Sequence, residues 1–250
     1  MGRFGTADAA HSHMDAPRVS TIDELLGLLD SLLDDRGPAW WTDFYSDPRR
    51  RCPFFTADPN EDLHALVEST TIRPPMHVLE LGCGNGRNAN FLSSRGFDVD
   101  AVDFSSSSIA QAHAAASSLA STARFHCRSI FDFRCDAAHY DLVYDSGCFH
   151  HIAPHRRPGY LDILSHALRP GGLFGLACFA TGDGSPTLSD REAYEGQSTH
   201  GGFSFTEEDL RQIFALRFEI LSLRRMRELP EDSGLFGKSF LWAGIFRKVP

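Results

Sequence analysis

The stretch Val78-Leu79-Glu80-Leu81-Gly82-Cys83-Gly84-Asn85-Gly86-Arg87-Asn88 decides the fold, because an apolar strand runs directly into a glycine-rich turn and then a helix. Glycines in such a turn let the main chain approach a ligand closely, and the following helix presents free N–H groups. Arg87 stands where the dinucleotide fingerprint Gly-x-Gly-x-x-Gly requires its third glycine. The spacing therefore disfavours a ligand that contains a pyrophosphate. A nicotinamide-dependent dehydrogenase remains only as a weaker alternative for the function.

Apolar, strand-like segments alternate with helical ones downstream of this motif, which indicates a mostly parallel sheet flanked by helices. We expect strands over 77–81, 98–103, 124–127, 140–144, 173–179, 218–223 and 240–246, and helices over 87–94, 105–119 and 159–168. Pro170-Gly171-Gly172 predicts a break, and Thr206 predicts the cap of a further helix.

The N-terminal part divides into a tail and a cover. Residues 1–19 show no period and are expected to be a disordered tail, and residues 20–250 a single domain. Thr21 and Glu24 have the spacing of a capping box, and a leucine-rich helix follows. The aromatic side chains within residues 40–55 suggest a lid over a pocket in the segment 20–70, although packing of these rings on the sheet is the alternative.

Composition excludes several classes of protein. The 250 residues contain 24 Lys and Arg against 33 Asp and Glu, a formal charge of −9 that disfavours nucleic acid as a partner. The 6 cysteines lack paired spacing, so we expect free thiols. No apolar run is long enough to span a membrane and no hydrophobic signal core is evident, so we expect a cytoplasmic protein. The oligomeric state stays open, with a monomer plausible.

Residues within the glycine motif and beyond it carry a resemblance to a known family. The Glu-x-Gly-x-Gly-x-Gly pattern resembles the first motif of class I S-adenosylmethionine-dependent methyltransferases. Between about Val78 and Phe179, the chain is similar to the thiopurine and thiol (halide) methyltransferase branch. The segments that carry this similarity are Ser129-Ile130-Phe131-Asp132, Tyr140-Asp141-x-x-Tyr144-Asp145-x-Gly147-Cys148, Ile152-x-Pro154-x-x-Arg157 and Tyr160.

The resemblance implies a Rossmann-like, seven-stranded α/β fold, S-adenosylmethionine as cofactor and S-adenosylhomocysteine as product. The expected cofactor-binding residues are Glu80, Gly82, Gly84, Gly86, Asn88, Asp103, Phe104, Ser129, Ile130, Asp145 and Ser146. Asp103 ends the second strand, where a carboxylate suits the two ribose hydroxyls, although capping of the next helix is the alternative. Ser146 stands where the thiopurine enzymes carry an arginine.

The acceptor side is expected near the end of the fourth strand and under the aromatic cover. His151 and Asp145 are the candidate bases, and the expected substrate pocket comprises Trp40, Trp41, Phe44, Tyr45, His150 and His155. Structural roles for at least two of the three histidines are the alternative, and no metal is expected because no ligand motif is complete. Cys148 is expected to act as a small apolar residue.

These features favour transfer of a methyl group to a small molecule, with a thiol or another sulfur nucleophile as the acceptor. Methylation of nitrogen or oxygen, and a protein that binds the cofactor without turnover, remain the alternatives.

Overall fold

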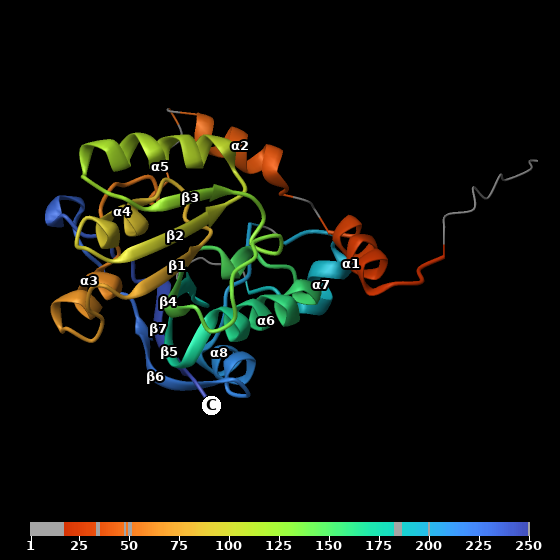
Figure 1. The fold of residues 1–250 in the computed structure, drawn as a ribbon. Helices are drawn as coiled ribbons and strands as arrows, with labels where there is room; N and C mark the ends of the chain where they lie inside the picture. The colour runs from red at the N-terminus through yellow and green to blue at the C-terminus, as the bar shows by residue number, and fades with distance from the viewer. Residues whose placement is uncertain are drawn as a thin grey trace, which may run out of the picture.

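A central sheet organises the computed structural model, which describes residues 18–33, 36–47, 49, 52–182, 187–199 and 201–249. The sheet has seven strands in the order β3-β2-β1-β4-β5-β7-β6, and β7 runs antiparallel to both of its neighbours (Figure 1). The strands are β1 (His77–Leu81), β2 (Asp98–Asp103), β3 (Arg124–Cys127), β4 (Tyr140–Ser146), β5 (Leu168–Phe179), β6 (Phe218–Arg225) and β7 (Leu241–Lys248). The expected seven-stranded, mostly parallel α/β fold is confirmed.

Helices cover both faces of the sheet (Figure 1). They are α1 (Ile22–Ser31), α2 (Pro38–Ser46), α3 (Glu61–Glu68), α4 (Arg87–Ser93), α5 (Ser106–Ser118), α6 (Arg157–Ala167), α7 (Asp190–Glu195) and α8 (Glu207–Phe214). Short 3₁₀ helices span Phe149–His151, Pro154–Arg156 and Glu231–Ser233. None of the helices in the described part of the chain is long and apolar enough to cross a bilayer.

Two apolar cores lie on opposite faces of the sheet. On one face, Tyr160 of α6 and Phe214 of α8 pack with the buried side chain of Phe174 on β5. On the other face, α3 and α4 contribute Leu63 and Phe91. Because parallel strands are buried on both faces, their sequences tend to be apolar runs, which made β1 recognisable.

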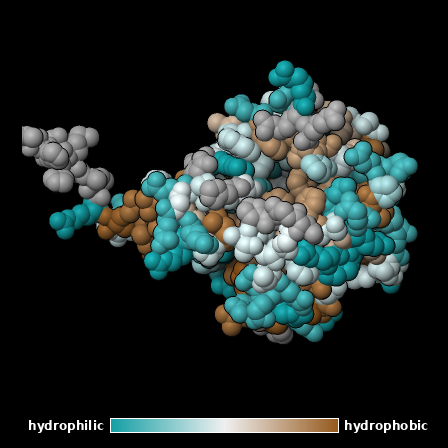
Figure 2. Space-filling model, turned by 180° about the vertical axis from the view of Figure 1, so that it is seen from behind, coloured by the Kyte–Doolittle hydropathy of each residue, from teal (hydrophilic) through white to brown (hydrophobic). Residues whose placement is uncertain are grey.

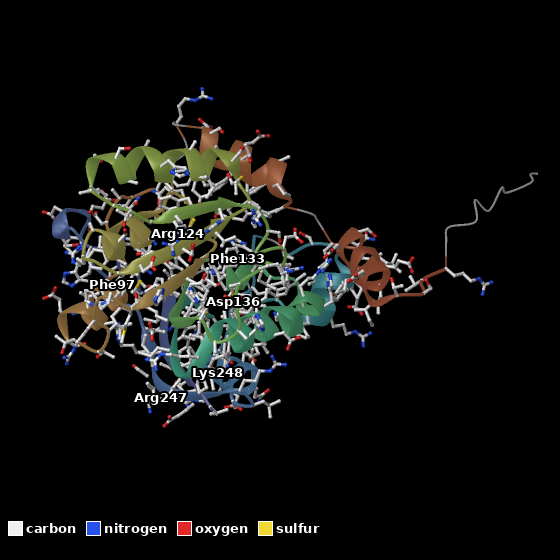
Figure 3. The ribbon with its side chains drawn as sticks, in the orientation of Figure 1. Phe97, Arg124, Phe133, Asp136, Arg247 and Lys248 are labelled. Carbon is white, nitrogen blue, oxygen red and sulfur yellow. The ribbon has the colours of Figure 1, made fainter. Side chains whose placement is uncertain are left out.

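Charged side chains link neighbouring strands of the sheet. Arg124, labelled in Figure 3, places Nη2 2.8 Å from Oδ2 of Asp100 and thereby links β3 to β2. Lys248, labelled near the end of β7, donates from Nζ to the carbonyl oxygen of Leu168 at 2.7 Å. These contacts link the edge strand β3 to β2 and the end of β7 to the start of β5.

The N-terminal helix α1 stands off the body of the protein (Figure 1). Its capping box is present as predicted, because Thr21 accepts a hydrogen bond from the Glu24 amide and Glu24 reaches back to the cap. Figure 2 shows a brown apolar surface on this projecting part, where Ile22, Leu25 and Leu28 are exposed. Of the predicted tail, residues 1–17 lie outside the described residues.

The strand predictions were most accurate near the glycine motif. The bounds expected for β1, β2 and β3 are those observed, and the helix expected after Thr206 is α8. The break predicted at Pro170-Gly171-Gly172 was wrong, because β5 continues through it with Gly171 at φ +74° and an irregular register against β4. The sequence patterns also did not predict α2, α3 and α7.

Candidate functional site

A cavity of about 640 Å³ opens at the carboxyl ends of the central strands, the position at which open α/β sheets bind ligands. Its floor comes from the segments that follow β1, β2, β3 and β4, and α2 covers it. Among its lining residues are Glu80, Gly82, Gly84, Asn88, Asp103, Phe104, Ser129, Ile130 and Ser146, all of which the sequence motifs singled out. The cavity therefore gathers residues from four separate segments.

The glycine turn supplies exposed main chain to this cavity. Gly82 and Gly84 adopt φ values of +66° and +53°, which side-chain-bearing residues rarely adopt. A Cβ atom on Gly84 would lie 2.7 Å from the Tyr45 hydroxyl oxygen, and one on Gly82 would lie 2.5 Å from Cβ of Cys148. The turn is thus tightly enclosed by α2 above and by the segment after β4.

Gly86 has a different role from the one expected. Its φ is +76°, and an added Cβ would lie 2.7 Å from Cβ of Ala112 and 2.9 Å from the ring of Phe125. Gly86 does not line the cavity. It allows α4 to start close against α5 and β3, so the expectation of a direct ligand contact is replaced by a packing role.

Asp103 faces the glycine turn from the end of β2. Its Oδ2 accepts a hydrogen bond from the Gly84 amide at 2.9 Å, and its Oδ1 accepts one from the Ser105 amide at 2.8 Å. Burial raises its pKa, while these amide bonds oppose the rise. The cap of α5 is Ser105, whose side chain accepts from the Ser108 amide. Each carboxylate oxygen of Asp103 retains acceptor capacity toward the cavity.

A buried polar group lies at the end of β1. Asn88 donates from Nδ2 to Oε1 of Glu80 at 3.1 Å, whereas Oε2 of Glu80 has no partner among the described residues. Burial raises the pKa of Glu80 to about 8. Beside it, Arg87 donates from Nη2 to Oγ of Ser146 at 3.2 Å. All four side chains line the cavity.

Asp145 does not line the cavity, although the sequence made it a candidate base and cofactor ligand. Its Oδ1 accepts from the amides of Cys148 and Phe149 at 2.9 and 3.2 Å, and its Oδ2 accepts from the Tyr160 hydroxyl at 2.7 Å. Burial raises its pKa to about 6. This geometry makes Asp145 the group that shapes the loop after β4 and argues against a direct contact with a ligand.

Two of the three histidines line the cavity. The ring of His150 stacks on Phe179 at 3.7 Å, and its Nδ1 accepts a hydrogen bond from the Phe179 amide at 3.3 Å. His151 lies edge-on to Trp41 at 4.8 Å, and burial together with the charge of Arg36 lowers its pKa to about 3. Both imidazoles are therefore held in the neutral form near pH 7.

His155, the third histidine, lies outside the cavity. Its Nδ1 is 2.6 Å from the Tyr194 hydroxyl, and its Nε2 is 2.7 Å from Oδ1 of Asp30. Arg156 also pairs with Asp30. His155 thus joins α1 to the body, and the expectation that it contacts a substrate is not supported. Within the described residues, no group of three or more His, Cys, Asp or Glu side chains has metal-binding geometry.

The aromatic cover is the helix α2. Trp40, Trp41, Phe44 and Tyr45 all line the cavity. The helix is anchored on α5, because Ser107 donates to the carbonyl oxygen of Thr42 at 2.7 Å and Gln111 donates to that of Tyr45 at 2.9 Å. Burial and the nearby Asp103 charge raise the pKa of Tyr45, so its hydroxyl stays protonated.

Sequence reasoning missed several cavity residues. Arg36 and Phe179 line the cavity although no motif includes them in that role, whereas Phe54 belongs to the aromatic segment that suggested a lid. Arg87 was visible in the motif, but only as the residue that replaces a glycine. The sequence feature that could have indicated a role for Arg87 in the cavity is its position as a positively charged residue directly after a glycine turn that binds a ligand.

Comparisons with known proteins place this fold and site in a family. Residues 78–172 match the methyltransferase domain family. An uncharacterized methyltransferase of Schizosaccharomyces pombe is 37% identical over 104 residues, which cover 42% of this chain and 72% of that protein. Trans-aconitate 2-methyltransferase of Deinococcus radiodurans is 31% identical over 147 residues, covering 58% of this chain and 54% of that protein.

A solved structure shares the fold over nearly the whole chain. The 1,6-didemethyltoxoflavin-N1-methyltransferase of Burkholderia thailandensis, solved with S-adenosylhomocysteine, has a TM-score of 0.60 and 20% identity. The similarity covers 94% of this chain and 93% of that one. Together with the family match and the relative from Schizosaccharomyces pombe, this likeness leads to one conclusion. The chain belongs to the class I S-adenosylmethionine-dependent methyltransferases.

Proposed function

We propose that the cavity holds S-adenosylmethionine with its ribose on Asp103, its adenine between Ser129 and Ile130, and its methionine end beside Ser146. The Asp103 carboxylate supports this placement, because each oxygen accepts one amide hydrogen bond and has capacity for a ribose hydroxyl. The cavity of about 640 Å³ also lies within the range that small-molecule sites occupy. The residues present therefore fit the cofactor.

We further propose that the acceptor is a small molecule with a nucleophilic sulfur, in keeping with the resemblance to the thiol-methylating branch. The observation that carries this proposal is the state of His151. Enclosed by Trp41 and near Arg36, it has a pKa of about 3, so it is a poor proton acceptor near neutral pH. Asp145, the other candidate base, has both oxygens engaged away from the cavity.

A thiol acceptor needs little from the protein as a base, because a thiolate forms at much lower pH than an alkoxide and at lower pH than a phenolate. The bound cofactor supplies an electrophilic methyl group on a sulfonium. The positive charge of Arg36 favours an anionic acceptor in the cavity, and Trp41 and Phe179 give this end apolar walls. The main contribution of the protein is then to align the acceptor and exclude water, a contribution of about 7–11 kcal/mol in well-oriented systems.

The test is an acceptor panel of thiols, thiopurines, amines and phenols, with S-adenosylhomocysteine formation as the readout. We expect turnover with thiols, and a pH midpoint of kcat/KM that follows the thiol pKa of each acceptor. The midpoint should stay the same in His151→Asn. A midpoint that is independent of the acceptor and lost in His151→Asn would identify His151 as a base and favour nitrogen or oxygen methylation. Binding of the cofactor without turnover of any acceptor would favour a binding protein.

A further inference from the structure

Arg36 lines the cavity at the end where α2 begins, whereas the glycine turn lies where α2 ends. The Tyr45 hydroxyl oxygen, near the last residue of this helix, lies 2.7 Å from the position that a Cβ atom on Gly84 would take. The guanidinium carbon of Arg36 instead lies 4.6 Å from the centre of the Trp40 ring, in the first turn. A rise of about 1.5 Å per residue separates Pro38 from Tyr45 by about 10 Å. The cation therefore belongs to the part of the cavity that lies away from the glycine turn.

The charge of Arg36 has no counter-ion among the described residues, although another arginine of the cavity wall does. Arg156 pairs with Asp30, whereas Arg36 forms no ion pair with a carboxylate in the described part of the chain. Besides Trp40, its guanidinium faces the main chain of Gly201, where an added Cβ atom would lie 3.6 Å from Nη1 and from Nη2. Gly201 has φ +102°, a conformation that side-chain-bearing residues rarely adopt. Glycine at this position thus leaves both terminal nitrogens uncovered on the side where it lines the cavity.

Uncharged rings lie beside this end of the cavity. His151 lies 4.8 Å from Trp41, and His150 stacks on Phe179 at 3.7 Å. Burial lowers the pKa of both histidines, so both rings are neutral near pH 7. Gly202 allows the chain to pack against them, because an added Cβ atom would lie 3.1 Å from Cδ2 of His150 and 3.2 Å from Nδ1 of His151. A cation beside apolar rings complements a flat apolar molecule that carries one negative group.

We propose that the methyl acceptor is an aromatic acid whose carboxylate binds the Arg36 guanidinium while its ring packs among Trp41, His151 and Phe179. A planar guanidinium with two open terminal nitrogens matches the two oxygens of a carboxylate. This inference rests on the proposed function, because it assigns the acceptor to the end of the cavity away from the proposed cofactor site.

The carboxylate is a recognition group and is distinct from the nucleophile. A thiol of the acceptor loses its proton to solvent, and the sulfur lone pair forms the new bond to the methyl group. The bond between that methyl group and the sulfonium breaks at the same time, its electron pair stays on the former sulfonium sulfur, and S-adenosylhomocysteine leaves. Arg36 takes part in no bond change, so its effect falls on acceptor binding and not on the chemical step.

The test compares two acceptors that differ in this charge, 4-mercaptobenzoate and 4-mercaptobenzamide, by NMR titration of the full chain saturated with S-adenosylhomocysteine. No methyl group can be transferred in this complex, so the titration measures binding alone. At about pH 7.5, where the carboxylate is ionised, the wild-type protein should bind the acid at least about fivefold more tightly than the amide. Arg36→Gln should bring the two dissociation constants within about twofold. Arg36→Lys should retain part of the preference, because the charge remains while the planar fork is lost.

Arg49→Gln is the matched control, because Arg49 follows the other end of α2, its side chain is 91% exposed and it does not line the cavity. This variant should keep the preference for the acid. With S-adenosylmethionine as donor, Arg36→Gln should lower kcat/KM for 4-mercaptobenzoate chiefly through KM. Binding of S-adenosylhomocysteine by Arg36→Gln as in the wild-type protein shows that the variant is folded.

Equal binding of the acid and the amide by the wild-type protein, or a preference that persists in Arg36→Gln, would overturn the inference. Turnover of neutral thiols alongside either result would leave the proposed function standing. A wild-type protein that binds neither S-adenosylhomocysteine nor the acid would overturn the proposed function and the inference together.

Discussion

Replacement of Asp103 by Asn removes one charge from the cavity with almost no change in shape. In the protein, the carboxylate accepts the Gly84 amide at 2.9 Å and the Ser105 amide at 2.8 Å. The Asn side chain keeps a single acceptor oxygen, so it loses one amide bond and presents an NH₂ group where a ribose hydroxyl would donate. The variant therefore affects both the glycine turn and the ligand.

The expected loss of affinity follows from the hydrogen bonds involved. A hydrogen bond to a charged group contributes about 1.5–3 kcal/mol, which corresponds to about a 10- to 150-fold increase in the dissociation constant of S-adenosylhomocysteine. The measurement is equilibrium dialysis at pH 8, because burial raises the pKa of Asp103 and this pH favours its ionised form. Urea unfolding of the free protein separates damage to the turn from the loss of ligand contacts.

Asp98→Asn is the matched control, because Asp98 begins the same strand at the end opposite to the cavity. Its carboxylate pairs with Arg124 at the surface, so its replacement should change the dissociation constant by less than about twofold. An unchanged dissociation constant in Asp103→Asn would refute the placement of the ribose. An equal loss in both variants would show that a general change in charge, and not contact, determines affinity.

Three further predictions concern buried groups of the site. Glu80 holds its proton up to about pH 8 when folded against an ordinary pKa of 4.5, so the free energy of unfolding should fall as pH rises between these values. Glu80→Gln should remove this loss and stabilise the free protein at pH 8, by no more than about 5 kcal/mol, in urea unfolding at pH 5 and 8. A steeper dependence in the variant would contradict the burial of a neutral Glu80. Gly84→Ala should weaken cofactor binding, because residue 84 adopts φ +53° and its Cβ would lie 2.7 Å from the hydroxyl of the covering tyrosine, so the turn or that tyrosine must shift. The control Gly171→Ala, also at positive φ but facing open space, should bind the cofactor normally. Tyr160→Phe should lower the free energy of unfolding by about 1–3 kcal/mol, because Oδ2 of Asp145 loses its 2.7 Å bond, and unchanged thermal stability would argue against that bond.

The fold was predictable where local sequence and tertiary packing favour the same conformation. The strand β1 is a largely apolar run directly before the glycine motif, and β2 carries Val99, Ala101 and Val102 between aspartates at its ends, so the bounds of both strands could be predicted to the residue. By contrast, α2 is built from Trp, Phe and Tyr, which have modest helix propensity and no clear period. Its helical form depends on its packing against α5, and no local sequence pattern predicts that contact.

The site was predictable where a motif fixes main-chain geometry. Gly82, Gly84 and Asp103 lie together as the motif implies. Asp145 was assigned to the cofactor on the family resemblance, yet alternation along β4 and the bonds from the Tyr160 hydroxyl and the Cys148 amide direct its side chain into the core. The orientation of a side chain at a strand end depends on tertiary partners that the sequence does not identify.

The most direct test of the account is calorimetric titration of the full wild-type chain with S-adenosylhomocysteine and, separately, with NADH. The account predicts saturable binding of one S-adenosylhomocysteine per chain and no competition from NADH. Absence of binding by S-adenosylhomocysteine, or its displacement by NADH at comparable concentration, would contradict the central claim that the glycine turn and Asp103 form a site for the methyl-donor cofactor.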